Sequence, residues 1–586
     1  MKKRAADRHV GGPFGRVLCY NTAMGVTKRK TIKIIIAIVT VALTCVSAST
    51  TTDYMAFEQK AFIAGENSTV QVYTPGEQGG LQKVKALPRG TAVVLRDART
   101  AEIEGDEYQR IYLDGDAANP ELKGEALYIK TTNLTDRKSK VVQEKELFVR
   151  TPVTLYQNSE GPEIAGFAPK GTKLEVTGYT GLNQKGEVAK YKVRVAADEN
   201  SKEEPEVFAY GKYLVRTQEE ADAVYNEHGE YDKAKKAKYD GMDLHGGKAT
   251  DLDYYPYERV KIKGKKFCRE ARAMYLNYYA ALHNDEYINI IKETKCNAVV
   301  IDLKDGGLSY KSPVAKELAP TAYKHGHVSV DEFKAAVKEF QDAGIYTIGR
   351  ITCFNDGDYA ADHPEDCISG SWPSAYSRDV WYYNVSLAIE AIDLMDFDEI
   401  QFDYVRFPES AYEMSLDGNT DFRNKYGESK AQAIQNFCFY AADQIHEAGA
   451  YFSVDVFGEC SNGYVTAYGQ YWPGISNIVD AISSMPYTDH FGDGDTWSQP
   501  KIIMSAWAKK AAKGQEMIPT PAAARTWITG YNTPFWAPSV NYDEQKLKDQ
   551  VDALYEAGLD GGFIPWNSGS PVPTYKMYKG IWNYGQ

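Results

Sequence analysis

Long apolar runs are scarce in this sequence of 586 residues. The segment IIIAIVTVALTCV covers only the 13 residues 34–46, whereas a membrane-spanning helix needs ~20. Four basic side chains between residues 28 and 33 precede it, and Val46-Ser47-Ala48 ends it with small residues. This order is typical of a secretory signal. We therefore expect residues 1–48 to be a leader, either cleaved (with Met24 as an alternative start) or kept as an N-terminal anchor, and the protein to be secreted or held at the cell surface.

Cysteine is also rare, with eight residues, and none lies between residues 46 and 267. The six cysteines of the C-terminal half have no spacing typical of a zinc site. Cys353 and Cys367 flank one loop and could form a disulfide outside the cell. Free buried thiols are the alternative, and the sequence leaves both open.

Several catalytic motifs are missing. The sequence contains no His-Glu-x-x-His zinc motif, no Gly-x-Ser-x-Gly nucleophile turn and no glycine-rich phosphate loop. The pair His325 and His327, residues 355–358 and residues 568–570 are more simply explained as exposed loops and turns. We therefore expect neither a metal nor a cofactor.

Basic residues are outnumbered, since 67 Lys and Arg face 80 Asp and Glu, and the net charge is −13. Residues 1–48 carry nine basic side chains and one acidic side chain, so the rest of the chain is more negative still. Such a surface repels phosphate backbones, and we expect no nucleic-acid partner. A strongly anionic substrate is also disfavoured unless local Arg or Lys compensates.

Two short all-β units are predicted at residues 55–136 and 145–216. In each, a Gly-Thr turn leads into alternating apolar and polar residues and then a tyrosine-rich closing strand. This order, present twice, resembles tandem bacterial SH3-like modules, which implies attachment to a bacterial cell wall. A β-spacer without a ligand is the alternative. The polar, charged residues 217–262 are predicted to be a linker.

Residues 263–586 alternate strand-like and helix-like segments. Eight βα alternations over this length favour an α/β fold, a (β/α)8 TIM barrel; an open doubly wound sheet is the alternative, but it would usually need a glycine-rich loop after its first strand. The predicted strands are AMYLNYY (273–279), NAVVIDLK (297–304), YTIGRIT (346–352), EIQFDYVRF (399–407), YFSVDVF (451–457), VDAISSMPY (479–487), RTWITGY (525–531) and DGGFIPW (560–566).

The predicted helices share a recognisable ending. An acidic residue, alanine and glycine close three of them, at Gly344, Gly449 and Gly558. Glycine at this position takes the left-handed conformation that ends a helix. Ser329 with Glu332, and Asn541 with Glu544, have the spacing of a capping box and predict two helix starts.

The carboxyl ends of the strands are where TIM barrels place their active sites. In strand 4, Ile400, Phe402 and Tyr404 share one face and suit the surrounding helices, so Asp403 is predicted to point to the barrel axis with Gln401 and Val405. The same alternation turns Asp455 of strand 5 inward. We predict that the two carboxylates converge as a catalytic pair, with a buried ion pair between Asp403 and Arg350 or Arg406 as the alternative.

Further candidates lie at the same end. Glu459, just past strand 5, is a third catalytic candidate, with a solvated loop residue as the alternative. Asp302 and Asp305 could instead form a salt bridge with Lys304, and the aromatic candidates could simply pack in the core. The predicted substrate-binding residues are Asp302, Lys304, Arg350, Arg406, Tyr487, Tyr531, Trp536 and Trp566.

Two carboxyl groups on either side of a sugar bond are what glycoside hydrolysis requires, one as acid and the other as nucleophile or base. The pattern therefore predicts a glycosidase. This hypothesis needs both acids in a cup that solvent can reach. If either carboxylate were sealed in the barrel and paired with an arginine, the hydrolase proposal built on this pair would be overturned, although the barrel prediction would not.

Six segments carry a resemblance to the DUF4015 family of glycoside hydrolase-like domains, which covers essentially residues 263–586. They are AVVIDLKDGGLSY (298–310), IYTIGRITCFND (345–356), FDEIQFDYVRFPES (397–410), FSVDVFGE (452–459), IVDAISSMPYTDHFG (478–492) and YDEQKLKDQVDALYEAGLDGGFIPWN (542–567). The resemblance implies an amylase-like TIM barrel, with Asp403 as nucleophile and an acid after strand 5. Strand 7 departs from the family pattern, which implies different substrate contacts there.

The sequence thus predicts a secreted or cell-surface hydrolase that cleaves O-glycosidic bonds of a polysaccharide with Asp403 and Asp455. Two alternatives stay open. One is a non-catalytic carbohydrate-binding or cell-wall scaffold protein. The other is a polygalactosaminidase-like hydrolase.

Overall fold

A computed structural model describes residues 58–76, 80–96, 100–113, 122, 124–195, 205–225, 243–491, 494–533 and 539–585. The predicted leader and Trp536 lie outside the described residues. Within the described part of the chain, no helix combines the length and the apolar character needed to cross a membrane.

The first β unit is one antiparallel sheet in the order β3-β2-β7-β6-β4-β1-β8, with β5 paired to β6. Alternation along β2 buries Val70 and Val72, which join Ile63, Leu87 and Ile111 in a small core. Its strands are β1 (Gln59–Ile63), β2 (Thr69–Pro75), β3 (Leu81–Pro88), β4 (Ala92–Leu95), β5 (Thr100–Ile103), β6 (Asp106–Leu113), β7 (Leu127–Lys130) and β8 (Leu134–Thr135).

The second β unit is a seven-stranded sheet in the order β11-β10-β14-β13-β12-β9-β15. Both units end alike, with a strand, a 3₁₀ turn (Thr131–Asn133 and Gly211–Tyr213) and a two-residue strand. The structure confirms a β-rich N-terminal region, while SH3-like modules stay a prediction. The strands are β9 (Glu146–Val149), β10 (Val153–Tyr156), β11 (Ile164–Ala168), β12 (Lys173–Tyr179), β13 (Lys190–Val195), β14 (Val207–Tyr210) and β15 (Leu214–Val215).

The region predicted as a linker begins with the short helix α1 (Gln218–Asp222). Its later part, residues 243–262, is also described. This later part packs on the C-terminal domain. Leu252 and Tyr254 lie in one buried cluster with Tyr471, and the Arg259 guanidinium donates to the carbonyl oxygens of Ser476 (2.8 Å) and Ile478 (3.2 Å).

The C-terminal domain is a closed barrel of eight parallel strands, each hydrogen-bonded to the next and the last to the first. All eight predicted strands are confirmed, and closure excludes the open doubly wound sheet. In barrel order the strands are β16 (Ala271–Leu276), β17 (Ala298–Lys304), β18 (Tyr346–Thr352), β21 (Glu399–Asp403), β22 (Tyr451–Phe457), β23 (Ala481–Met485), β24 (Ala523–Thr529) and β25 (Gly562–Trp566).

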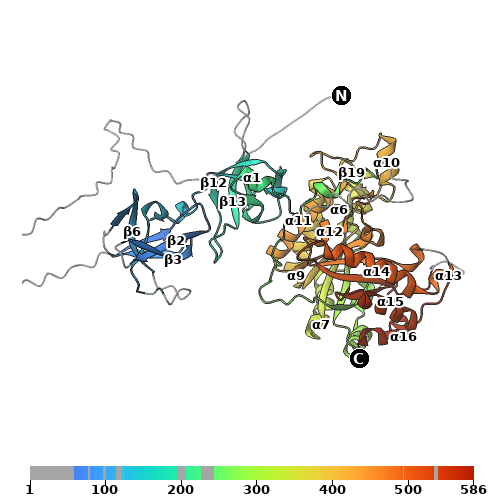
Figure 1. Ribbon diagram of the computed structural model, residues 1–586. Helices are drawn as coiled ribbons and strands as arrows, with labels where there is room; N and C mark the ends of the chain where they lie inside the picture. Colours follow the sequence, from blue (N-terminus) through green and yellow to red (C-terminus); the bar gives the residue numbers. More distant parts are fainter. Residues whose placement is uncertain are drawn as a thin grey trace, which may run out of the picture. The chain divides into compact units, whose positions relative to one another are not determined.

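Helices cover the outside of the barrel, and α14 and α15 pack side by side (Figure 1). A small hairpin of β19 (Cys367–Ser369) and β20 (Trp372–Pro373) lies between α8 and α9 in the chain. The helices are α3 (Tyr278–Leu282), α4 (Asp285–Lys292), α5 (Pro313–Leu318), α6 (Pro320–His325), α7 (Val330–Asp342), α8 (Gly357–Asp362), α9 (Arg378–Met395), α10 (Ala411–Asp417), α11 (Lys430–Ala448), α12 (Trp472–Ser476), α13 (Gly494–Trp497), α14 (Pro500–Glu516), α15 (Glu544–Glu556) and α16 (Val572–Met577).

Helix ends follow the predicted chemistry with one exception. Gly344, Gly449 and Gly558 have φ of 75°, 96° and 80°, so each takes the left-handed conformation expected at a helix C-terminus. Ser329 caps α7, as predicted. The predicted cap at Asn541 is wrong, because Asp543 accepts the Lys546 N–H and starts α15 two residues later.

The six cysteines of the described chain are all free thiols, and five of them are buried. Cys353 lies in the apolar interior. The Cys367 thiol donates to the His363 carbonyl oxygen. The disulfide alternative for this pair is therefore wrong.

Candidate active site

Asp403 and Asp455 both point into the barrel, as strand alternation predicts. Their neighbour Phe402 faces the other way and stacks on Phe437 of α11, with ring centroids 5.6 Å apart. The alternation fails one residue later. Tyr404 has a φ of 54°, which ends β21 at Asp403 and turns Val405, predicted to face the axis, into the apolar layer under the helices.

Arg350 of β18 is the centre of the cluster, because its strand lies between β17 and β21. Its Nη2 donates to Asp403 Oδ2 at 2.6 Å, and its Nη1 donates to Asp302 Oδ1 at 2.6 Å. Asp305 Oδ1 lies 3.7 Å from Nη1, and Asp455 Oδ2 lies 3.7 Å from Nε. One guanidinium therefore faces four carboxyl groups.

Three further donors orient these carboxyl groups. The Tyr275 hydroxyl donates to Asp302 Oδ2 at 2.5 Å, and the Tyr404 backbone N–H donates to Asp403 Oδ1 at 2.6 Å. The Trp527 indole N–H donates to Asp455 Oδ1 at 2.8 Å. The second oxygen of Asp455 is fully buried and accepts no hydrogen bond.

Burial sets the electrostatics of the cluster. It raises the pKa of the Asp455 carboxyl well above 3.8, and the charge of Asp403 raises it further, against the opposing effects of Arg350 and the Trp527 N–H. Burial also raises the pKa of Asp302 to about 6, although Arg350 opposes this. For Arg350, burial disfavours the charge, but Asp302 and Asp403 outweigh it and raise the guanidinium pKa.

The predicted solvent-accessible meeting of Asp403 and Asp455 is wrong. Asp455 has no exposed side-chain surface, and Asp403 is exposed on only 5% of its side chain and is paired with Arg350. The alternative of a buried Asp403–Arg350 ion pair is thus the observed arrangement. Asp305 is the carboxyl group of the cluster that solvent reaches, with 47% of its side chain exposed.

Lys304 does not face the mouth of the barrel. The pairing of β17 with β18 shifts register between Asp302 and Lys304, so the lysine turns outward where simple alternation would turn it inward. Its Nζ donates to Asp356 Oδ2 at 2.6 Å and to Asn384 Oδ1 of α9 at 2.9 Å. The expected salt bridges from Asp302 and Asp305 to Lys304 are therefore wrong, because these carboxyl groups turn to Arg350.

Arg406 and Glu459 lie beside the cluster and are held by aromatic side chains. The Arg406 guanidinium lies 4.1 Å from the ring centroid of Phe457 and 5.1 Å from that of Tyr404. Burial lowers the pKa of Arg406. Glu459 is half-buried and accepts hydroxyl hydrogen bonds from Tyr464 (2.9 Å) and Tyr468 (3.1 Å), so it is not a solvated loop residue.

An aromatic wall stands at the ends of β23, β24 and β25. Tyr487 lies 5.5 Å from Trp566 and 6.0 Å from Tyr531, measured between ring centroids. Tyr487 is buried and the other two are half-buried. Burial and the charges of Asp403 and Asp455 raise the pKa of Tyr487, so this wall closes one side of the carboxylate cluster.

The floor below the cluster is filled by polar pairs. Arg525 Nη1 donates to Glu399 Oε1 at 2.6 Å with both side chains fully buried, and Gln401 Nε2 donates to Ser483 Oγ at 3.0 Å across the barrel. The interior is therefore a packed core, as in other TIM barrels. Any substrate has to approach from the carboxyl ends of the strands.

Sequence reasoning missed three contributors to the site. Tyr275 and Trp527 were counted only as strand residues, although alternation with Ala273 and Arg525 would have turned both inward. For Asp305 the sequence leaves open a salt bridge with Lys304, and the register shift in β17 turns Lys304 away and leaves Asp305 to Arg350. That irregularity has no clear signal in the sequence.

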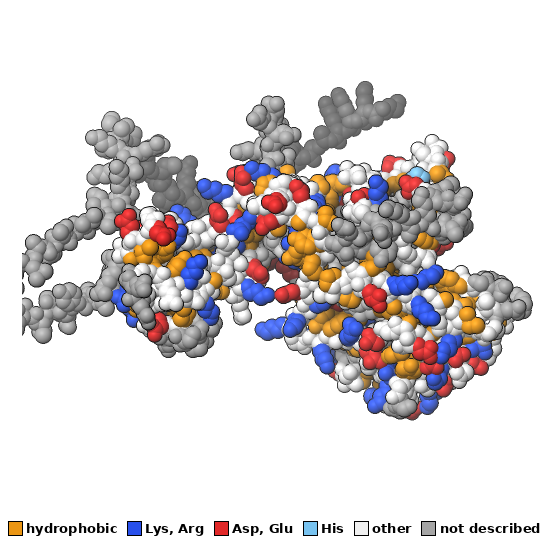
Figure 2. Space-filling view, viewed as in Figure 1, with side chains coloured by type: hydrophobic (Ala, Val, Ile, Leu, Met, Phe, Trp, Pro, Cys, Tyr) orange, Lys and Arg blue, Asp and Glu red, His pale blue; other side chains and the backbone are white. Residues whose placement is uncertain are grey.

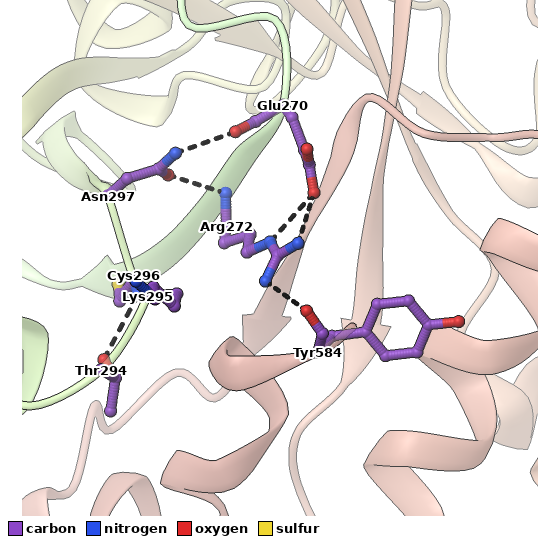
Figure 3. A pocket seen from close by; sticks show the side chains of 7 residues that line it. All are labelled: Glu270, Arg272, Thr294, Lys295, Cys296, Asn297 and Tyr584. Atoms are coloured by element: carbon purple, nitrogen blue, oxygen red, sulfur yellow. Dashed lines mark hydrogen bonds and ion pairs between the residues drawn. The ribbon is translucent and has the colours of Figure 1, made fainter. Parts of the chain in front are cut away.

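A sizeable cavity lies elsewhere. It has a volume of about 520 Å³ and is lined by Glu270, Arg272, Asn297 and Tyr584 among others (Figure 3). Glu270 and Asn297 immediately precede β16 and β17, so the cavity lies at the amino ends of the strands. Active sites of TIM barrels lie at the opposite end, and we assign this cavity no part in the site.

One group of described side chains has the geometry to hold a metal ion. Ligand atoms of His363, Glu365 and Asp366 lie within 4.8 Å of one another. His363 Nδ1 is 3.3 Å from Glu365 Oε1, and the Asp366 carboxyl accepts from Tyr359 and Ser377. These contacts explain why the three side chains lie together near the β19–β20 hairpin without a metal ion: they form an ion pair and a network of hydrogen bonds at a helix end.

Charged side chains of both signs are interspersed with apolar ones on the face of the barrel seen in Figure 2. The acidic excess of the sequence is therefore not gathered on this face. Three of the four carboxyl groups around Arg350 are buried and add little to the surface.

Fold and site together define a TIM-barrel protein with an acidic cluster and an aromatic wall at the carboxyl ends of its strands. The DUF4015 family, described as "Putative glycosyl hydrolase domain", matches residues 273–571. This match spans half of the chain, and the chain belongs to that family. The recognition made from the strand-end segments is confirmed.

Solved structures are similar over parts of the chain. A hypothetical protein from Ruminiclostridium thermocellum ATCC 27405 is 30% identical, with 31% of this chain and 97% of that chain covered and a TM-score of 0.26. The PgaB (BpsB) glycoside hydrolase domain from Bordetella bronchiseptica is 12% identical (54% and 100% covered, TM-score 0.40). The endo-β-1,4-mannanase from Thermotoga petrophila is 11% identical (55% and 78% covered, TM-score 0.37). A search of the curated proteins found no match.

Proposed function

We propose that this protein is a glycoside hydrolase that acts on a polysaccharide, with Asp403 and Asp305 as its reacting carboxyl groups. The observation that carries the proposal is that these two groups, from the carboxyl ends of β21 and β17, pair with the same guanidinium of Arg350, and that solvent reaches the Asp305 side of this pair. Membership in a family described as a glycosyl hydrolase domain supports the reaction class.

Asp305 replaces Asp455 in this proposal for a physical reason. A general acid or base has to come within hydrogen-bond reach of the substrate or of one bound water. Asp455 has no exposed side-chain surface, so it cannot come within reach of a substrate, and burial raises its pKa well above 3.8. Asp305 is exposed and precedes Gly306 and Gly307, and the space beside both glycines is open to a ligand.

The contacts suggest a division of roles. Arg350 and the Tyr404 N–H donate hydrogen bonds to both carboxyl oxygens of Asp403 and fix its orientation, which suits a nucleophile or base. Asp305 would then deliver the proton to the leaving oxygen. One guanidinium and two ion pairs lie between the two carboxyl groups. This separation is compatible with the distance between the catalytic carboxyl groups of glycosidases, ~5–5.5 Å in retaining enzymes and ~6.5–9.5 Å in inverting ones.

The test is a set of single amide variants incubated with neutral, acidic and amino-sugar polysaccharides. We expect reducing ends from the wild type, and a fall of about 10²–10⁴-fold in Asp403→Asn and Asp305→Asn. Asp455→Asn and Glu459→Gln should keep most of the activity. Full activity in Asp403→Asn would contradict the proposal, and loss only in Glu459→Gln would move the acid to Glu459.

A non-catalytic carbohydrate-binding protein is the second candidate. The near-complete burial of Asp403 and Asp455 favours it, because a binding site needs only the exposed aromatic edge of Tyr531 and Trp566. Glycan retention by the wild type without release of reducing ends, unchanged in Asp403→Asn, would select this function.

We further propose that the protein works outside the cytoplasm, with the β units as attachment modules on the cell wall. The apolar segment 34–46 with its basic flank supports export. Fractionation of the producing cells, with N-terminal sequencing of the mature protein, tests this. Recovery from the cytoplasm with residues 1–48 intact would contradict it.

A further inference from the structure

The aromatic wall continues beyond the carboxylate cluster along the rim of the barrel. Tyr487 and Tyr531 follow β23 and β24, and Trp566 is the last residue of β25. Strand β25 pairs with β16, which closes the barrel. Tyr278 and Tyr279 follow β16 directly. Four consecutive strands therefore end in aromatic side chains, from one side of the cluster to the other.

Two tyrosines of this rim form parallel stacks with histidines. Tyr278 stacks on His327 with centroids 3.9 Å apart and planes inclined by 5°, and Tyr279 stacks on His283 at 4.2 Å and 29°. His283 Nδ1 lies 2.9 Å from the Tyr279 carbonyl oxygen, which holds the second stack together. We call these four residues the tyrosine–histidine rim.

Core packing accounts for half-buried Tyr278 but not for the other three residues of this rim. Tyr279 is exposed on 60% of its surface, and His283 and His327 are exposed as well. An exposed aromatic side chain on a protein surface leaves apolar area in water, which a ligand can cover. A ring with a polar edge suits a sugar, whose C–H face stacks on the ring and whose hydroxyls reach the phenol or imidazole.

The rim adjoins the loop that carries Asp305. The His327 backbone N–H donates to the Leu308 carbonyl oxygen at 3.1 Å, and the Asp305 N–H donates to the Gly307 carbonyl oxygen at 3.0 Å. The residues between them, Gly306 and Gly307, have open space beside them. A chain bound on the rim would therefore lead over this loop to Asp305 and Arg350.

We propose that the tyrosine–histidine rim binds a sugar unit several residues away from the bond that reacts, so the substrate is a neutral polysaccharide chain long enough to reach from Arg350 to the rim. This inference rests on the proposed function and specifies its substrate class. The excess of acidic over basic groups in the nearby cluster disfavours an anionic chain, and the phenol rings of the rim supply a contact that needs no charge on the sugar.

Affinity electrophoresis of the full chain in native gels tests the rim. The gels contain glucomannan, xylan, mixed-linkage β-glucan or glycol chitin as probes. We expect Tyr279→Ala to bind the retarding glycan about three- to tenfold more weakly than the wild type. Tyr279→Phe should keep most of the affinity. Ile502→Ala, which removes an apolar side chain of similar exposure on α14, should change nothing.

The outcomes separate the rim from the site. If the rim binds the polymer, the Tyr279→Ala variant is retained more weakly by the polymer, turns over a short aryl glycoside at an unchanged rate and has an unchanged melting temperature. Equal retention by wild type and Tyr279→Ala overturns the rim while leaving the proposed function intact. Equal losses on polymer and short substrate assign Tyr279 a structural role and also overturn it. No retention of any of these neutral probes overturns the rim, and the proposed function falls with it only if acidic and amino-sugar polysaccharides are not cleaved either.

Discussion

Arg350 and Asp403 form an ion pair of 2.6 Å in which neither side chain is exposed on more than 6% of its surface. The pair couples two neighbouring strands, and the same guanidinium reaches Asp302 on the strand beyond. Taking charges out of water is costly, and partners on both sides offset that cost here. The removal of one member therefore has larger effects than its surface area suggests.

Arg350→Met leaves Asp302 and Asp403 without their cation. We expect a loss of ~3–5 kcal/mol in the free energy of unfolding at pH 7.5, measured by urea unfolding. The loss should be smaller at about pH 5, because the pKa of Asp302, about 6 through burial, lets that group take up a proton there. A loss that does not depend on pH would contradict this account.

Asp455→Asn removes a carboxyl group that has no exposed side-chain surface. Because burial raises its pKa above 3.8, the unfolded chain loses this proton at lower pH than the folded chain does. The group's contribution to wild-type stability is thus fullest below pH 3.8 and declines as the pH rises toward the folded value. The variant should gain relative to the wild type by up to ~1.4 kcal/mol per pH unit in that window. Urea unfolding at a series of pH values measures the difference, and a constant offset would refute it.

Lys304→Met tests the outward orientation of this lysine. The substitution leaves Asp356 buried without its cation, and we expect a loss of ~3–5 kcal/mol in unfolding free energy. Glycan binding at temperatures where the variant is folded should not change. The double variant Lys304→Met, Asp356→Asn should recover part of the stability, since no unpaired charge remains. If the Lys304→Met variant were stable but bound glycan more weakly, Lys304 would instead be a substrate-binding residue.

Gly562→Ala tests the closure of the barrel between β25 and β16. Gly562 has a φ of 97°, and an added Cβ would lie 2.1 Å from the Ala271 carbonyl oxygen. Gly558 has a similar φ of 80° but open space around it, so Gly558→Ala is the matched control. We expect ~1–2 kcal/mol for the control, from backbone conformation alone, and a clearly larger loss for Gly562→Ala. Thermal unfolding of both variants checks this, and equal losses would argue against a close approach of the two strands.

Local sequence patterns predict most of the fold. Period-two alternation and glycine helix ends are local, and they located all eight strands and the C-termini of α7, α11 and α15. The inward orientation of Asp403 and Asp455 follows from the same alternation. The cap of α15 was misplaced by two residues, because Asn541 and Asp543 are both good caps and only the fold selects one.

Local sequence patterns are sufficient to predict a barrel of eight strands with acidic residues at their carboxyl ends. They do not predict which of these acids solvent reaches, because that depends on contacts between strands far apart in the chain. The register shift in β17 turned Lys304 outward and left Asp305 to Arg350, and the Trp527 indole N–H from β24 engaged buried Asp455. Alternation along a strand predicts the face on which a side chain lies. How deeply that side chain is buried and which residues it contacts depend on how the eight strands close around one axis.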